Sequence, residues 1–473
     1  MISAQQLTLK FRAIKNSDTA SVTNHKTAKA LLYFIAFALF AEALPLSTNY
    51  RLPLLASVLS HFSKQPTVAN ASVAQPTSTP VATMQPGEIE DPSGRALRAY
   101  FNALRLTETQ CGQARISHYG DSPITNDGIT ATVRRKLQER FGDGGHGFIL
   151  AGKPWGWYQH DSVALDARGW QSNVMWYTRG DTLFGLGGAN FIANSPQAFA
   201  SFATSTTSEL GHHVAGFEIY YLAQPNGGDL LIEVEGQPAQ RITTASDAPR
   251  SAFQRVSVTA GAHQLTLKPA GNGAVRLFGV VLDSGERGVQ YDSLGVNGAF
   301  VGLLSHYLDE ANWREQLQHR QPNLVILAYG ANESEYENWP MEQYVQDMRE
   351  AVRRIRAALP EASIMFVAPM DRGQRGPGGT ITTRSMIPKI VAAQRAVAAA
   401  TGCAFFDTFT AMGGAGTVAR WRAARPLLMG GDYLHPTAEG AEIVGTLLYD
   451  ALNRAYEKQQ ATQSQIVPPT KQK

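Results

Sequence analysis

The residues that could do chemistry begin with Ser122. It ends the run Ile-Ser-His-Tyr-Gly-Asp-Ser over residues 116–122. The apolar start and the Gly-Asp-Ser end of this run are typical of a strand that delivers a serine to a tight turn. A serine hydroxyl is a weak nucleophile unless a neighbouring base removes its proton. Nucleophilic chemistry at Ser122 therefore requires a histidine from elsewhere in the chain.

His435 is the best candidate for that base. The segment 431–437 reads Gly-Asp-Tyr-Leu-His-Pro-Thr, and Asp432 precedes the histidine by three residues. A carboxylate in this place can accept a hydrogen bond from one ring nitrogen and leave the other nitrogen facing the serine. The pattern indicates a Ser-His-Asp triad. The alternative is that Ser122 is an ordinary turn residue, Asp432 caps a helix and His435 is a surface residue.

Two further segments could supply hydrogen-bond donors to an oxyanion, which needs donors aimed at the oxygen that becomes negative. Gly298 ends the run Gly-Val-Asn-Gly, and a glycine lets a backbone N–H approach closely. Asn332 ends the run Gly-Ala-Asn after an apolar strand over 324–329, and it offers a side-chain amide. We therefore predict an oxyanion hole that includes Gly298 and Asn332.

The elements around these residues follow an alternating strand and helix pattern. After Ser122, apolar residues recur at 129, 133, 137 and 141, close to the helical period, and Asn126 or Asp127 stands at the N-cap position. Further strands are predicted over 289–292, 324–329, 363–368 and 403–407, with helices over 300–317, 344–359, up to 401, and 437–458. The candidate residues follow strand ends, and in an open α/β sheet ligands bind at the carboxyl ends of the strands.

In this order, Gly-Asp-Ser at 120–122, Gly298, Gly-x-Asn at 330–332 and Asp-x-x-His at 432–435 resemble the four blocks of the SGNH (GDSL) hydrolase superfamily. The resemblance covers about 113–149 and 286–458. It implies a flavodoxin-like, three-layer α/β fold with a parallel sheet of order 2-1-3-4-5. It also implies Ser122 as nucleophile, His435 as base and Asp432 as its orienting carboxylate. The oxyanion hole would consist of Gly298, Asn332 and the N–H of Ser122. Independently of the resemblance, we expect Asp121 and His118 in supporting roles: His118 either holds the floor of the site by hydrogen bonds or is purely structural. Pro123 departs from the leucine of many members.

Residues 150–285 do not follow the α/β pattern, because their apolar residues alternate in twos between glycine-rich turns. We expect an inserted all-β sandwich between the hydrolase parts 95–149 and 286–458. Such an insert, together with the run Gly-Asp-Gly-Gly-His-Gly-Phe at 142–148, resembles the bacterial peptidoglycan O-acetylesterases, in which the insert is similar to a carbohydrate-binding module. The aromatic residues of the insert either stack on sugar rings or fill its core: Trp155, Trp157, Tyr158, Trp170, Trp176 and Tyr177.

The N-terminal part of the chain indicates export. Residues 31–41 carry no charge, are shorter than the ~20 residues of a membrane-spanning helix, and precede Ala-Glu-Ala, a pattern typical of a signal-peptidase site. We predict a signal peptide or membrane anchor over 1–46, a flexible linker over 47–94 and a disordered tail over 459–473. The expected location is the periplasm or another exported compartment, with a tether to the inner membrane as the alternative to cleavage.

The composition of the chain limits the kinds of partner that it is expected to bind. The 473 residues carry a net charge of +3 with basic and acidic residues nearly balanced, so nucleic acid is not an expected partner. No phosphate-binding glycine motif and no ligand cluster for a metal is evident, and we expect neither a cofactor nor a metal.

The two cysteines, Cys111 and Cys403, begin strands that the predicted order separates, so we expect free thiols. Arg372 and Arg375, in a glycine-rich loop, either meet an acidic group of the substrate or are simply solvated.

These observations predict an exported serine esterase that removes O-acetyl groups from a cell-surface glycan, with peptidoglycan as the expected substrate. Two alternatives stay open. One is an O-acetyltransferase with the same triad, in which a sugar hydroxyl instead of water accepts the acyl group. The other is a glycan-binding protein that kept the fold without turnover. The sequence does not determine the glycan, the length of the acyl chain or the oligomeric state.

Overall fold

The computed structural model describes residues 87–110, 112–178, 180–205 and 208–466. The predicted signal peptide or anchor, most of the predicted linker and Cys111 lie outside these residues. Cys403 is buried and its thiol is free. Within the described ranges, no helix combines the length and the apolar character that crossing a membrane requires.

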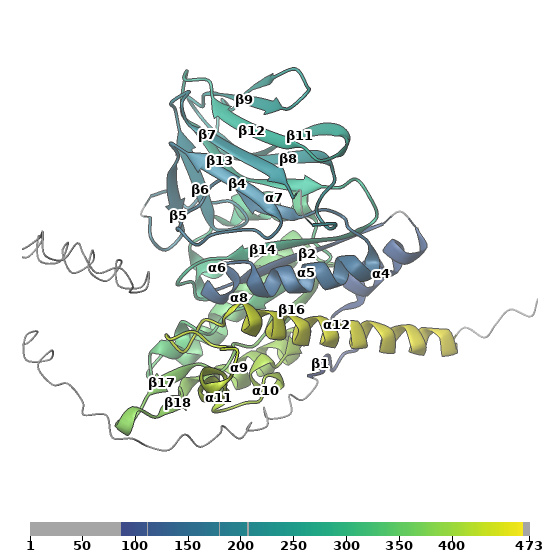
Figure 1. Cartoon of the computed structure of the whole chain (residues 1–473), viewed down its shortest axis with the longest axis vertical. Coiled ribbons are helices and arrows are strands. Elements are labelled where there is room, and N and C mark those ends of the chain that lie inside the picture. Colours follow the sequence, from purple (N-terminus) through teal and green to yellow (C-terminus); the bar gives the residue numbers. More distant parts are fainter. Residues whose placement is uncertain (1–86, 111, 179, 206–207, 467–473) are drawn as a thin grey trace, which may run out of the picture. The chain divides into compact units, whose positions relative to one another are not determined.

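The candidate residues follow the carboxyl ends of strands in one six-stranded sheet (Figure 1). Its order is β1-β19-β16-β15-β2-β14. The strands are β1 (Ile89–Glu90), β2 (Gln113–Gly120), β14 (Gly288–Gly295), β15 (Leu324–Ala328), β16 (Ser363–Val367) and β19 (Ala404–Phe406). Neighbouring strands are parallel except β1, which is antiparallel to β19. The sheet is therefore mixed and not purely parallel, and the predicted linker does not extend to residue 94.

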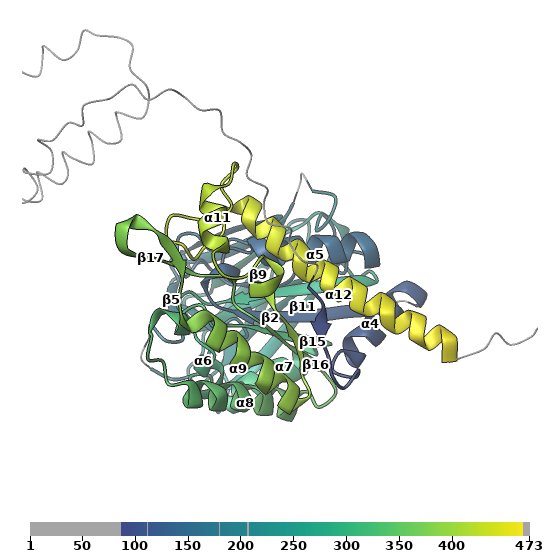
Figure 2. The same ribbon diagram turned by 90° about the horizontal axis from the view of Figure 1, so that it is seen from below.

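Helices cover both faces of this sheet, as the nearly continuous apolar strands require. In β15, Val325 and Leu327 belong to one buried cluster, whereas Leu324 and Ile326 belong to the cluster on the opposite face. The helices α4 (Arg98–Thr109), α5 (Gly128–Phe141) and α12 (Ala438–Ile466) pack on the second face. The first face is covered by α6 (Gly302–His306), α7 (Glu310–Arg320), α8 (Met341–Ala358) and α9 (Met386–Thr401). Figure 2 shows the two helical layers on either side of the strands.

Several predicted boundaries need correction. The single helix predicted over 300–317 is two helices, because Asp309 caps a new one: its side chain accepts a hydrogen bond from the N–H of Asn312 at 2.8 Å. The tail predicted as disordered from 459 is helical through Ile466, and Tyr456 anchors this last part of α12 in the core. The glycine-rich loop after β16 contains a hairpin of β17 (Gly373–Arg375) and β18 (Ile381–Thr383). Short helices α10 (Thr408–Ala411) and α11 (Thr417–Ala423) follow β19.

Between α5 and β14 the chain forms two antiparallel sheets, drawn in blue to teal in Figure 1. One has the order β10-β9-β12-β7-β4, and the other has the order β11-β8-β13-β6-β5, with β3 paired to β13. Their strands are β3 (Gly147–Leu150), β4 (Val163–Arg168), β5 (Gln171–Val174), β6 (Ala189–Ala193), β7 (Phe199–Thr204), β8 (Val214–Ala223), β9 (Asp229–Val234), β10 (Gln240–Thr243), β11 (Arg250–Gly261), β12 (Gln264–Pro269) and β13 (Val275–Asp283). Their apolar side chains share one buried cluster with α7 and the first face of the hydrolase sheet. That this insert binds carbohydrate stays a prediction.

The register of the main sheet brings three strand ends together. Gly120 of β2 pairs with Gly295 of β14 on one side and with Ala328 of β15 on the other. Ser122, Gly298 and Asn332 each follow one of these three residues by two to four positions. The loops that carry them therefore leave the sheet at the same edge.

Candidate active site

Ser122 begins a tight turn directly after β2. Residues Ser122–Ile124 form one 3₁₀ turn, with Pro123 at its start, and the carbonyl oxygen of Ser122 accepts hydrogen bonds from the N–H and the hydroxyl of Thr125 at 3.1 and 2.8 Å. Proline suits this position because its fixed φ matches the first residue of a helical turn. Only 6% of Ser122 is exposed. The serine is thus held by its backbone while its hydroxyl is free to meet another side chain.

That other side chain is His435. Its Nε2 lies 2.7 Å from Oγ of Ser122, and its Nδ1 lies 2.6 Å from Oδ2 of Asp432. The other carboxylate oxygen of Asp432 accepts hydrogen bonds from the N–H groups of Leu434 and His435, each at 3.1 Å. Burial acts to raise the pKa of Asp432, but the hydrogen bond from the His435 ring and those from the two N–H groups outweigh it and hold this pKa below its ordinary value. Asp432 is therefore ionised, and it orients the imidazole toward Ser122.

Gly298 and Asn332 lie in two loops that are joined to each other. The side-chain amide of Asn332 donates to the carbonyl oxygen of Ala299 at 2.7 Å. An amide carries two N–H groups, so one of them remains to serve a ligand. Gly298 has a φ of +71°, and a Cβ there would lie 2.7 Å from the hydroxyl of Tyr177. The backbone conformation thus favours glycine at 298, and a larger residue there would also displace the Tyr177 hydroxyl.

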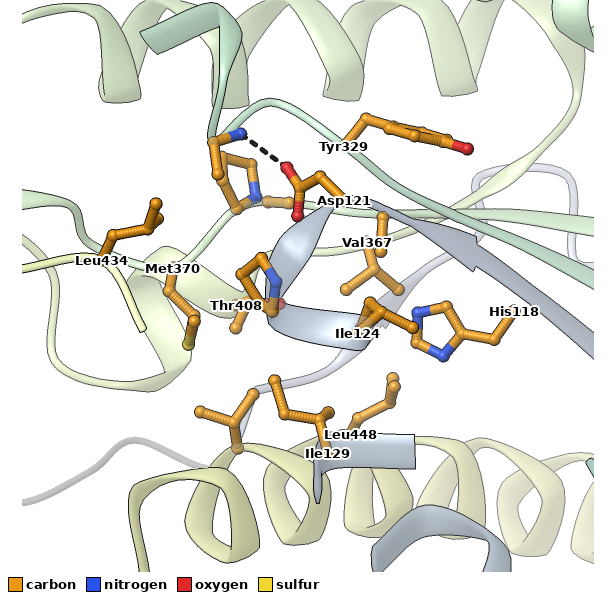
Figure 3. A pocket seen from close by; sticks show the side chains of 16 residues that line it. His118, Asp121, Ile124, Ile129, Tyr329, Val367, Met370, Thr408, Leu434 and Leu448 are labelled. Atoms are coloured by element: carbon orange, nitrogen blue, oxygen red, sulfur yellow. Dashed lines mark hydrogen bonds between the residues drawn. The ribbon is translucent and has the colours of Figure 1, made fainter. Parts of the chain in front are cut away.

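Asp121 ties these loops to the turn of Ser122. Its carboxylate accepts a hydrogen bond from the N–H of Ala331 at 3.1 Å, and Figure 3 shows this contact. Burial raises the pKa of Asp121 well above its ordinary value, and the nearby carboxyl of Glu333 adds to the effect. Asp121 is therefore a buried link between the β2 and β15 loops, and it makes no contact with His435 among the hydrogen bonds of the described residues.

His118, for which we expected a supporting role, is buried on β2. Its Nδ1 and the hydroxyl of Tyr291 share a hydrogen bond of 2.7 Å, and burial lowers its pKa to about 3, so the ring is neutral. It faces a cavity of about 40 Å³ next to the Ser122 turn, together with Ile124, Thr408 and Leu434 (Figure 3). On the same measure, a cavity of roughly 10–15 Å³ holds one water molecule. This cavity is far too small for a sugar ring, so a glycan would approach Ser122 from its open side.

Arg372 is used within the protein. Its guanidinium donates to the carbonyl oxygen of Ala331 and pairs with Glu335, which also pairs with Arg384 at 2.9 Å. Arg375 is exposed, and its Nε donates to the hydroxyl of Tyr433 at 2.9 Å. Of the two arginines considered for substrate contact, only Arg375 lies open to solvent beside the histidine loop.

Two further side chains, Glu333 and Tyr177, hold the loops of the site, and the sequence did not predict this role. Glu333, directly after Asn332, is fully buried and accepts a hydrogen bond from the N–H of Val301 at 3.0 Å. Burial raises the pKa of Glu333 to about 7. Tyr177 donates its hydroxyl to the carbonyl oxygen of Asn297 at 3.0 Å and thereby holds the Gly298 loop from the insert side. Neither role has a signal in the sequence, because a glutamate or tyrosine in a polar loop is ordinarily exposed.

Asp127 stands at the start of α5, as predicted, but its side chain does not cap the helix. Its carboxylate accepts two hydrogen bonds from Arg134 at 2.7 and 3.1 Å and one from the N–H of Asp161 at 2.8 Å. Both members of this ion pair are buried. Although burial acts to raise the pKa of Asp127, the charge of Arg134 outweighs it and lowers the pKa. The pair fixes the helix after Ser122 to the first loop of the insert.

A family model matches part of the chain. The GDSL-like lipase/acylhydrolase family matches residues 257–443, which include Gly298, Asn332, Asp432 and His435. Ser122 lies outside the matched residues, because the insert separates it from them in the sequence, and the fold returns it to His435. The chain contains a GDSL-like (SGNH) lipase/acylhydrolase domain, and it is by class an SGNH-type esterase.

Comparison with one solved structure, at a TM-score of 0.65, supports the SGNH hydrolase fold. A structure described as a peptidoglycan O-acetylesterase in action shares 22% identity with a TM-score of 0.65, over 78% of this chain and 99% of that one. A family 2 carbohydrate esterase with a carbohydrate-binding domain from Corynascus thermopiles (Myceliophthora fergusii) shares 13% identity with a TM-score of 0.27, over 62% of this chain and 99% of that one. A family two carbohydrate esterase from Clostridium thermocellum in complex with cellohexaose shares 10% identity with a TM-score of 0.25, over 56% and 94%. No curated protein sequence matches the chain.

Proposed function

We propose that the protein is an exported serine esterase that removes O-acetyl groups from a cell-surface glycan, with O-acetylated peptidoglycan as its substrate. The observation that carries the proposal is the chain of hydrogen bonds from Ser122 through His435 to Asp432, at 2.7 and 2.6 Å. This is the arrangement in which a carboxylate orients an imidazole and the imidazole activates a hydroxyl.

The reaction would proceed in two steps. Oγ of Ser122 attacks the acetyl carbonyl carbon while Nε2 of His435 takes the hydroxyl proton. The tetrahedral intermediate then collapses, the sugar oxygen leaves with that proton, and an acetyl group remains on Ser122. In the second step His435 removes a proton from water, the water oxygen attacks the same carbonyl carbon, and acetate leaves as Ser122 recovers its proton.

The negative oxygen of each tetrahedral intermediate would lie among three N–H donors. They are the backbone N–H groups of Ser122 and Gly298 and the second amide N–H of Asn332, which Ala299 leaves unused. Because Asn332 is already oriented by Ala299, it needs no rearrangement when the charge develops. The two aspartates have different functions. Asp432 orients His435, and Asp121 holds the loop after β15 through the N–H of Ala331.

Two observations lead to the choice of substrate. A solved structure that shares this fold at a TM-score of 0.65 is described as a peptidoglycan O-acetylesterase. The uncharged run over 31–41, with the small-residue pattern after it, favours export, where a cell-wall glycan would be met. These points lead us to propose an acetylated wall glycan over a lipid or a soluble ester.

The test compares the protein with its Ser122→Ala variant. On p-nitrophenyl acetate and on acetylated wall fragments, the parent should release acetate, and the variant should lose at least ~10³-fold of this rate. Thermal unfolding would check that the variant is folded. Retention of full activity by a folded Ser122→Ala protein would reject the mechanism. Mass spectrometry of the fragments decides between water and a sugar as acceptor, since a transferase would yield newly acetylated sugar instead of free acetate.

A further inference from the structure

We propose that aromatic side chains beside the oxyanion loop form a stacking platform for the sugar rings of the glycan, and that the insert supplies one end of it. This inference rests on the proposed function and extends it to the substrate. The platform consists of Trp176, Tyr177, Phe300, Tyr307, Tyr336 and Trp339.

The first argument is exposure. Seven large apolar side chains are exposed among the described residues, and four of them belong to the platform: Trp176 (47%), Tyr177 (57%), Tyr307 (38%) and Tyr336 (61%). Scattered exposed apolar side chains need no explanation, but a continuous group of them marks a binding surface. Aromatic rings that merely sealed the junction between insert and hydrolase would be buried.

The second argument is continuity. Trp176 meets Phe300 edge to face with ring centres 4.9 Å apart, and it also contacts Tyr307 at 6.1 Å. Phe300 continues the series to Trp339 at 5.9 Å, and Trp339 stacks on Tyr336 at 5.7 Å with an interplanar angle of 30°. The rings therefore hold one another in place, which lowers the entropy that a ligand would otherwise have to remove.

The third argument is position. Phe300 lies two residues after Gly298, and the Tyr177 hydroxyl is bonded to Asn297 at 3.0 Å. Tyr336 lies four residues after Asn332, on the other oxyanion loop. The platform thus extends along both loops that would hold the reacting carbonyl. A glycan chain with one acetyl group at Ser122 would have its neighbouring ring over these aromatic side chains.

Trp176 is also held in a strained conformation. Its φ is +84°, which is rare for a bulky residue, and the turn that enforces it is closed by hydrogen bonds from the N–H groups of Tyr177 and Thr178 to the carbonyl oxygen of Val174. Strain of this kind is uncommon and clusters at functional sites. Here it directs the indole toward Phe300 and the Gly298 loop.

The chemistry of the surface selects its ligand. Flat rings that are half exposed bury the C–H face of a pyranose ring, while the tyrosine hydroxyls and the indole N–H can serve sugar hydroxyls at the edges. A ring-shaped, polar-edged ligand therefore fits better than a lipid tail.

The experiment compares two esters that differ in the presence of a sugar. Acetate release is measured from ethyl acetate and from O-acetylated peptidoglycan fragments, for the parent, Trp176→Ala, Trp176→Phe and Tyr336→Ala. We expect Trp176→Ala to lower kcat/KM on the fragments about tenfold, mainly by raising KM. On ethyl acetate, the decrease in kcat/KM should be several-fold smaller than on the fragments. Trp176→Phe should regain most of the loss because it keeps a ring. Tyr449→Ala, which removes an aromatic ring from α12, should match the parent on both esters.

Equal losses on the two esters, or no loss on the fragments from Trp176→Ala, would overturn the platform. A second measurement separates it from the proposed esterase activity. Binding of peptidoglycan oligomers to the Ser122→Ala protein is measured by isothermal titration calorimetry, and it should weaken about tenfold when Trp176→Ala is added. If the oligomers bind in this way but the parent releases no acetate from them, the platform stands and the esterase proposal fails. If the parent deacetylates them and Trp176→Ala changes neither binding nor rate, the platform alone is wrong.

Discussion

The side-chain amide of Asn332 donates a 2.7 Å hydrogen bond to the carbonyl oxygen of Ala299, and this bond joins the two loops that flank Ser122. One loop follows β14 and the other follows β15. Asp121 adds a second connection, from the turn of Ser122 to the N–H of Ala331. The three strand ends are therefore held as one unit, and each connection can be tested by itself.

Replacing Asn332 with alanine should reduce kcat by about 10²–10³-fold, as the loss of one oxyanion donor typically does. The variant also loses the bond to Ala299, so Gly298 would be less well placed. Steady-state rates on p-nitrophenyl acetate measure the effect. The exposed Asn338 of the same segment provides a matched control, and Asn338→Ala should retain the parent rate. Similar decreases in kcat for both variants would show that Asn332 is not an oxyanion donor.

Asp432→Asn should reduce kcat by roughly 10²–10⁴-fold while the fold is kept, because an amide neither stabilises an imidazolium nor holds the same tautomer. The two N–H groups of Leu434 and His435 that bond to Asp432 could still be served by the amide oxygen. A folded variant with the parent rate would mean that Asp432 only shapes the loop. Single-turnover acetylation of Ser122 would be the direct measurement.

Tyr177→Phe separates the hydroxyl from the ring. It removes the hydrogen bond to Asn297 but leaves the aromatic face, so we expect kcat to fall several-fold on ethyl acetate and on the glycan alike, with KM for the glycan nearly unchanged. Tyr177 would then be a positioning residue that acts through Gly298. A change confined to KM for the glycan would instead assign the hydroxyl to substrate binding.

Glu333 predicts a pH dependence of stability. Its pKa in the folded protein is raised to about 7 by burial, whereas in the unfolded chain it has the ordinary value of a glutamate. The unfolded state therefore releases this proton first as the pH rises from about 4.5, and stability is lost up to about pH 7. The loss amounts to at most ~3 kcal/mol.

Glu333→Gln, which keeps the acceptor for the N–H of Val301, should remove this part of the pH dependence. Unfolding in urea at pH 5 and pH 8 provides the comparison. The variant should gain stability relative to the parent at pH 8 and show little difference at pH 5. A parent whose stability rises between these values in step with the variant would show that Glu333 ionises freely in the folded protein.

The buried ion pair of Asp127 and Arg134 should stabilise the fold without taking part in catalysis. Asp127→Ala would leave a buried guanidinium unpaired, and breaking such a pair costs about 3–5 kcal/mol. It would also free the N–H of Asp161 in the first loop of the insert. Denaturant unfolding measures the loss. An exposed pair between α5 and α12, Arg135 with Glu442, gives the control, and Glu442→Ala should cost far less.

Much of this arrangement could be inferred from the sequence, because short motifs at strand ends are local. Gly-Asp-Ser, Gly298, Gly-x-Asn and Asp-x-x-His each announce a turn or a polar side chain after an apolar run. The resemblance to SGNH hydrolases then joined them, and the family match supports that resemblance. The structure places Ser122, His435 and Asp432 within hydrogen-bond distance, while their catalytic roles stay a prediction.

What the sequence did not reveal depends on contacts between distant segments. The edge strand β1 exists because Ile89 and Glu90 pair with β19, a partner more than three hundred residues away. Asp127 looked like a helix cap, and only the fold shows that Arg134 uses its carboxylate. Of the aromatic residues in the insert, Tyr158 is buried and Trp157, Trp176 and Tyr177 are exposed, although all lie in similar surroundings along the chain.

The insertion between α5 and β14 also has a consequence for synthesis. β2 leaves the ribosome long before β14 and β15, the two neighbours that must flank it, because the whole insert is translated in between. The nascent chain therefore carries an unpaired apolar strand while the insert's own sheets are completed, a state in which strands are prone to aggregate. Assembly of the esterase core must wait for its C-terminal half, so truncated products of translation would lack the catalytic cleft.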